Sequence, residues 1–118
     1  MNAWMAPAGV SMDAGYIVYT KDTDLSRPGA ANLVVFTDEN PYSINDGFFI
    51  EVSLTAWYDI PASYHNGAGG LAFADGHAQL HKWTDPAVLK QSQPVSGNPI
   101  SATGVDAYWL MEHMSARQ

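Results

Sequence analysis

The sequence has 118 residues and a formal net charge of −7, with five Lys plus Arg against twelve Asp plus Glu. The basic residues are scattered rather than gathered in a patch, so the phosphate backbone of a nucleic acid would be repelled. The absence of cysteine excludes disulfides, thiolate nucleophiles and sulfur-ligated zinc or iron. Length and an apolar content of 47% predict one folded domain, residues 1–118.

Residue types predict several short strands in the first half of the chain. β-branched and aromatic residues are concentrated in four segments, 16–20, 33–36, 48–52 and 56–58. Breaks rich in Pro, Gly, Asn and Asp separate them. No apolar run approaches the roughly 20 residues of a membrane-spanning helix, and the first residues lack the features of a signal peptide. As it stands, the sequence predicts a soluble chain.

Residues 70–83 predict a β-hairpin. Asp75-Gly76 lies between two strand-like halves, a strong signal for a two-residue turn. Pairing across such a turn gives one apolar face, formed by Leu71, Phe73, Ala78 and Leu80. His77 and His81 then lie on the other face.

Two short helices follow the hairpin. Asp85 is a candidate N-cap before Pro86, which predicts a helix over 87–90. Residues 91–104 predict a loop, and Asp106 can cap a last helix over 107–114. The fold class expected is α+β, a small antiparallel sheet of about four to six strands with one or two short helices.

A spaced motif links the hairpin to a known family. His65, nine intervening residues and Asp75-Gly76 form the pattern H-x9-DG. Further stretches occur in the same order, namely Asp38-Glu39, Ser43 to Gly47, and Asp106 followed by Trp109-Leu110. The chain resembles prepilin-type proteins of the H-x9-DG class, which are related to the major pseudopilins of type II secretion. The resemblance implies a pseudopilin-like globular head.

Family members carry an N-terminal leader and a long hydrophobic helix that packs into a pilus-like fibre. This sequence shows neither, so the resemblance implies that Met1 corresponds to an internal methionine of a longer protein. It places that longer protein in the cell envelope or outside the cell, with other pseudopilin subunits or a second copy as partners. Without the helix, an apolar sheet surface is expected to be uncovered and to promote dimerisation or aggregation.

The segment from Asp38 to Asp46 is rich in hard oxygen donors. Calcium takes about six to eight such ligands and accepts mixed donors, whereas magnesium is less suited to an irregular loop. Related major pseudopilins hold calcium in a loop, so the resemblance points to the same ion. The predicted ligands are Asp38, Glu39, Asn40, Ser43, Asn45 and Asp46, with Asp75 as a further candidate. The alternative is that these side chains cap strands and form Asx-turns, and that Asp75 serves its hairpin turn.

The histidines give a weaker signal for chemistry. On a strand, the Cα atoms of His77 and His81 lie about 13 Å apart, which is too far to share one metal ion. His65 precedes a glycine-rich stretch that could fold it back towards Asp75. Such a pair would either pin the loop to the hairpin or supply His65 as a catalytic base.

The sequence leaves three functions open. The first is a calcium-binding domain with a structural or assembly role. The alternative is a calcium-dependent hydrolase of small esters or lactones with a histidine base, although no established catalytic motif is present. The third is carbohydrate or surface binding through Trp4, Trp57 and Trp83, at least two of which we expect in the core.

Overall fold

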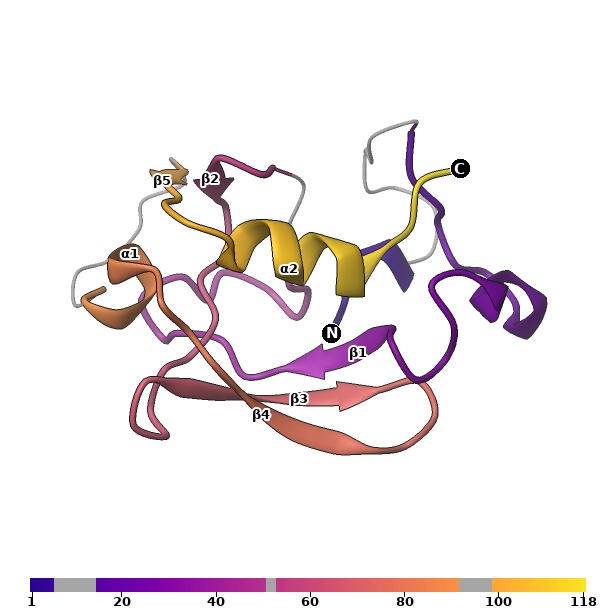
Figure 1. Ribbon diagram of the computed structural model, residues 1–118, viewed down its shortest axis with the longest axis horizontal. Helices are drawn as coiled ribbons and strands as arrows, with labels where there is room; N and C mark the ends of the chain where they lie inside the picture. Colours follow the sequence, from indigo (N-terminus) through magenta and orange to yellow (C-terminus); the bar gives the residue numbers. More distant parts are fainter. Residues whose placement is uncertain (6–14, 51–52, 92–98) are drawn as a thin grey trace.

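The computed structural model describes residues 1–5, 15–50, 53–91 and 99–118. These residues form a small α+β fold, as the sequence predicts (Figure 1). In chain order the elements are the 3₁₀-helices η1 (Ala3–Met5) and η2 (Asp22–Ser26), the strands β1 (Val34–Thr37), β2 (Ala56–Trp57), β3 (Ala68–Phe73) and β4 (Ala78–Lys82), helix α1 (Pro86–Leu89), strand β5 (Ile100–Ser101) and helix α2 (Asp106–Met114). No helix within the described ranges is both long and apolar enough to cross a membrane.

The main sheet is antiparallel, with strand order β1-β3-β4. The predicted hairpin is present, but its register differs from the prediction by one residue. Ala72 pairs with Ala78, and Phe73 donates its backbone N–H to the His77 carbonyl at 2.9 Å. The loop therefore has three residues and ends on Gly76, whose φ of +90° is the conformation that this kind of loop requires at its last position.

The shifted register places different side chains on the two faces of the sheet. A shift of one residue moves a whole strand's side chains to the opposite face. His77 and His81 therefore lie on the same side as Leu71 and Phe73, the inner face that α2 covers. The predicted apolar face of Leu71 with Leu80 is wrong, because Leu80 pairs with Gly70 and lies on the outer side.

The other predicted strands form only in part. β1 and β2 match segments 33–36 and 56–58, and β2 pairs with β5 in a second, two-stranded sheet. β5 lies inside the segment predicted as a loop. Segment 16–20 contributes a single bridge between Tyr16 and Arg117, and Phe49 forms a single bridge with Asn2. Residues 51 and 52 of the predicted strand lie outside the described residues.

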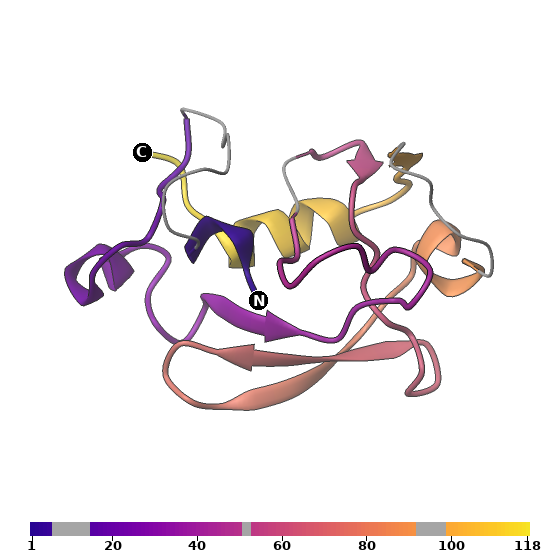
Figure 2. The ribbon, with the colours of Figure 1, turned by 180° about the vertical axis from the view of Figure 1, so that it is seen from behind.

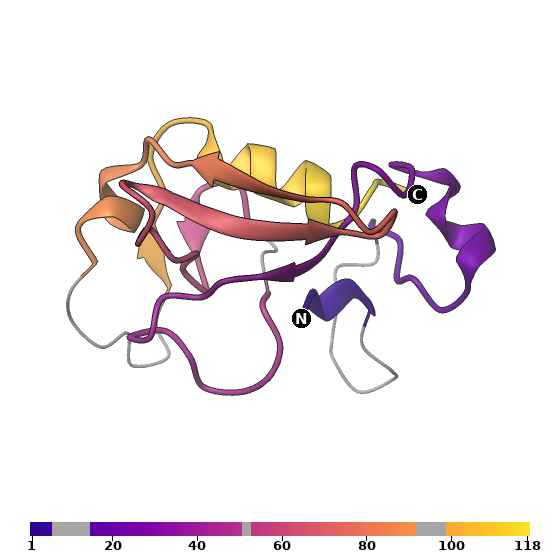
Figure 3. The same cartoon turned by 90° about the horizontal axis from the view of Figure 1, so that it is seen from below.

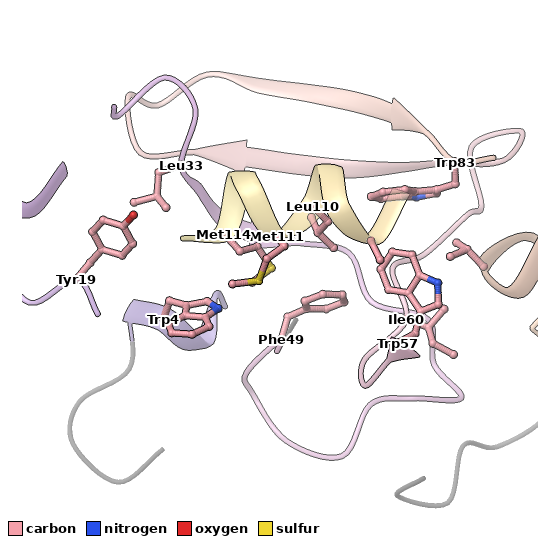
Figure 4. Packing of buried hydrophobic residues seen from close by; sticks show 12 residues of the cluster. Trp4, Tyr19, Leu33, Phe49, Trp57, Ile60, Trp83, Leu110, Met111 and Met114 are labelled. Atoms are coloured by element: carbon pink, nitrogen blue, oxygen red, sulfur yellow. The ribbon is translucent and has the colours of Figure 1, made fainter. Parts of the chain in front are cut away.

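Helix α2 forms the centre of the core and separates the main sheet from the small one (Figures 1 and 2). Large side chains from distant parts of the sequence, including Trp4, Phe49 and Trp57, pack in one cluster with Leu110 of this helix (Figure 4). Trp4 and Trp57 are fully buried and Trp83 is 1% exposed. All three tryptophans proposed for carbohydrate binding are therefore core residues, which overturns that hypothesis.

Two buried carboxylates join the helices to each other. Asp85 caps α1 as predicted, accepting from the Ala87 N–H at 2.8 Å. The sequence predicts Asp106 as the cap of α2, but it is the first residue of that helix. Its carboxylate instead accepts from the backbone N–H groups of Thr84 at 2.6 Å and Asp85 at 2.7 Å. The start of α2 is thereby fixed to the start of α1.

Candidate functional site

The oxygen-rich loop follows β1, and the structure engages several of its predicted ligands in the fold. Asn40 is buried, and its side-chain oxygen accepts from the Tyr42 N–H at 3.0 Å. Buried Ser43 donates its hydroxyl to Glu39 at 2.8 Å and accepts from the Ile60 N–H at 3.1 Å. The interpretation of these two residues as turn and capping groups therefore accounts for their contacts.

Carboxylates crowd together where this loop meets the segment after β2. Asp59 is only 4% exposed, and one of its oxygens accepts from the Ile50 N–H at 2.7 Å. Asp59, Asp46 and Asn45 line a hollow of about 110 Å³. Asp59 was missed because it is an isolated residue, and only the folding of Ile60-Pro61 against the loop brings it near.

This cluster holds several negative charges in a partly buried place, with the positive Met1 ammonium near enough to lower the pKa values of Glu39 and Asp59. Burial, with the added repulsion of Asp59 and Asp46, raises the pKa of Glu39 to about 7. Burial and the charge of Asp46 also raise the pKa of Asp59. A bound cation would offset this repulsion, and so would a proton.

The cluster fits calcium only if neutral oxygens complete it. Within the described part of the chain, no three His, Cys, Asp or Glu side chains are arranged to hold a metal ion. Calcium also accepts amide and backbone carbonyl oxygens, which Asn45 and the loop backbone supply. The Asp46 carboxylate is partly used, because it accepts from the Phe48 N–H at 2.7 Å. Asp38 is exposed and reaches over Gly70 of β3.

The structure does not bring His65 and Asp75 together. His65 lies exposed in the turn before β3, and Asp75 lies in the turn after it. The glycine-rich stretch between them was expected to be flexible, but it forms β3, whose six residues span about 20 Å. The Asp75 carboxylate instead pairs with His77, and hydrogen bonds from His77 lower the pKa of Asp75.

The outer face of the main sheet is formed by Phe36, Ala72, Ala78 and Leu80. The sequence predicts a different apolar face for this sheet. Phe36 pairs with Ala72, Ala72 pairs with Ala78, and Leu80 follows on β4. Phe36 is 56% exposed and Leu80 is 62% exposed. No described segment covers this face in the view from below (Figure 3).

A larger hollow, of about 740 Å³, lies beside the C-terminal half of α2. Polar side chains in its wall already have partners within the protein. Ser115 donates to the Ile17 carbonyl at 2.7 Å, Asn32 donates to the Pro28 carbonyl at 3.1 Å, and Glu112 interacts with Tyr108. This wall therefore offers little polar recognition to a ligand.

Comparisons of the chain with protein-family models, with curated proteins and with solved structures give no match. The resemblance to prepilin-type proteins therefore rests on the motifs in the sequence.

Proposed function

We propose that this chain is the calcium-binding globular head of a pseudopilin-like protein, with a structural role in an assembly of subunits. The observation that supports it best is the uncovered outer face. Its two large apolar side chains, Phe36 and Leu80, are more than half exposed on the surface of a regular sheet. Contiguous exposed apolar surface of this kind marks sites of association.

The charges beside the outer face favour a second copy as the partner. Asp38 reaches over Gly70, the residue that pairs with Leu80, and Lys82 lies two residues further along β4. A two-fold axis that passes near Leu80 in the plane of the interface, diagonal to the strands, would bring each Asp38 towards the Lys82 of the other copy. One acidic and one basic residue flanking an apolar centre make the surface complementary to itself, as a two-fold interface requires.

Sedimentation equilibrium tests this association. Reversible dimer formation is expected, and Leu80→Lys should abolish it because two lysines would face each other across the axis. Val105→Lys is the matched control, since Val105 is 68% exposed but lies at the start of α2, away from this face. A monomer at millimolar concentration, or equal effects of the two variants, would contradict the proposal.

The calcium part of the proposal is supported by the Asp46 and Asp59 carboxylates, which line one hollow with Asn45 and whose charges raise the pKa of Glu39. In a structural role, the cation would offset these charges and fix the loop after β1. Because a bound cation would lower the pKa of Glu39 again, we expect calcium binding to compete with protonation of Glu39.

The calcium-dependent hydrolase remains the alternative, with His65 as the base because Asp75 engages His77. It predicts hydrolysis in a panel of small esters and lactones that chelation and His65→Ala both abolish while the fold is retained. A panel with no turnover would remove it.

A further inference from the structure

Three histidines gather with aromatic rings on the inner face of the main sheet. The Trp109 indole on α2 is stacked between two imidazoles, with ring centroids 3.7 Å from His81 on β4 and 3.9 Å from His113 on α2. The interplanar angles are 20° and 21°. The edge strand β4 and the helix are therefore joined through one indole with a titratable ring on each side.

The stack continues towards the hairpin turn. Phe73 contacts His113 edge-on at 6.4 Å and is stacked on His77 at 4.3 Å. His77 differs from the other two because it lies exposed beside the hairpin turn, where it pairs with the Asp75 carboxylate and does not contact Trp109 directly.

His81 has the opposite environment. It is half-buried between Trp109 and Trp83. The ring centroids of His81 and Trp83 lie 4.5 Å apart. Burial lowers the pKa of His81, the charge of Asp106 on α2 opposes this, and His113 adds to the lowering. Lys82, the next residue on its own strand, adds no favourable charge.

His113 has one ring nitrogen fixed. Its Nδ1 lies 2.7 Å from the Trp109 carbonyl, and because a carbonyl only accepts, Nδ1 carries a proton and donates. A positive charge on His81 would therefore lie across the indole from an imidazole whose Nδ1 is already engaged, with Glu112 as the adjacent carboxylate on the exposed side of α2.

We infer that the His81–Trp109–His113 stack is a pH-sensitive clasp that holds α2 against β4 while His81 is neutral and loosens when His81 is protonated. The sign follows from the lowered pKa of His81. The unfolded chain binds the proton more readily than the folded one, so this contribution to stability is full above the unfolded value of about 6.5 and is lost as pH falls through the folded pKa.

Amide hydrogen exchange of α2 tests the clasp between about pH 7.5 and about pH 5.5, with correction for the intrinsic pH dependence of exchange. Protection of the α2 amides is expected to fall severalfold at the lower pH in the wild-type chain. His81→Phe, which keeps a flat ring but cannot titrate, should remove most of this fall. His65→Phe, at the exposed turn before β3, should retain it.

A measurement on the wild-type chain keeps the inference testable if His81→Phe does not fold. NMR titration should show His81 accepting its proton below the value of about 6.5 of an unperturbed histidine. If His81 titrates at or above that value, or if His81→Phe and wild type lose protection equally, the clasp is wrong.

Discussion

Among the glycines that the structure describes, Gly69 is the one where an added Cβ would meet the closest neighbour. A Cβ built there would lie 2.4 Å from the Ala62 carbonyl oxygen and 3.0 Å from Trp83 Nε1. These two atoms are themselves joined by a hydrogen bond of 3.0 Å. The absence of a side chain thus lets β3 pass directly under the contact that fixes Trp83 in the core.

Gly69→Ala should therefore destabilise the protein by about 2 kcal/mol, the typical cost of forcing extra volume into a packed place. Denaturant unfolding measures the change. Gly47→Ala is the control, because a Cβ at Gly47 meets nothing within 4 Å. Equal midpoints for the two variants would show that the segment at Ala62 can move away.

Asp85 has the densest set of hydrogen bonds of the buried carboxylates. One oxygen accepts from Trp57 Nε1 at 2.7 Å and the Thr103 N–H at 2.8 Å, and the other accepts from the Thr103 hydroxyl at 2.9 Å and the Ala87 N–H at 2.8 Å. Burial alone would raise its pKa, but these donors outweigh burial and lower the pKa of Asp85. A single negative charge thus joins α1, β2 and the segment after β5.

Asp85→Ala should lower the free energy of unfolding by about 3 kcal/mol, because it leaves several buried donors without an acceptor. In the wild type, the stabilisation is present above the unfolded pKa of about 3.9 and is lost as pH falls through the lower folded value. The variant should lack this acid-dependent part. Exposed Asp22→Ala is the control, and a similar loss of stability there would argue against a specific role for the Asp85 contacts.

At the scale of elements, the hairpin of β3 and β4 has the greatest consequence for function. Its register decides that Leu80 lies on the outer face and that His81 lies under α2. A two-residue turn at Asp75-Gly76 would reverse both placements. The association surface and the clasp therefore depend on the three-residue loop that ends at Gly76.

Cysteine labelling distinguishes the two registers, because the chain has no cysteine of its own. Leu80→Cys should react with a thiol reagent in the folded protein, at concentrations too low for association. Leu71→Cys, at a position that is 2% exposed, should react only after unfolding. Protection of both thiols would support the register in which Leu71 and Leu80 share a buried face.

The elements that sequence reasoning predicted well are those determined by local pattern. β1 follows from an apolar run, α2 from its helical residues, and α1 from Asp85-Pro86. Local pattern could not predict the register of the hairpin. Asp75-Gly76 suits a two-residue turn, and Ala74-Asp75-Gly76 suits a three-residue loop equally well. β5 was missed because a pairing of two residues per strand depends on tertiary packing.

The candidate site was predictable only for residues close together in the sequence. The loop from Asp38 to Asp46 was identified by its oxygen donors, but its interior members Asn40 and Ser43 serve the fold. Asp59 lies 13 positions after Asp46, and its approach depends on how the chain folds back. No local pattern contains that information.

For the whole molecule, the crowded carboxylates link stability to both pH and calcium. The folded protein binds a proton at Glu39 more tightly than the unfolded chain, because the pKa rises from 4.5 to about 7. For a group with a raised pKa, stability is full below the unfolded value and is lost as pH rises through the folded one. Without calcium, Glu39 should therefore make the protein less stable at pH 8 than at pH 5, and Glu39→Gln should remove that part of the difference.

Calcium should reverse this loss by taking the place of the proton. At about pH 8, calcium at ~100 times its dissociation constant should add ~2.7 kcal/mol to the free energy of unfolding. At about pH 5 the gain should be much smaller, because Glu39 is then protonated. Thermal melting in calcium and in chelator at both pH values measures the effect, with Asp59→Asn expected to weaken it and exposed Asp22→Asn to leave it unchanged. Identical melting curves at pH 8 would remove calcium from the proposal. The association would then be judged by sedimentation alone, because Phe36 and Leu80 lie on β1 and β4 and only the first loop residue, Asp38, is placed beside them here.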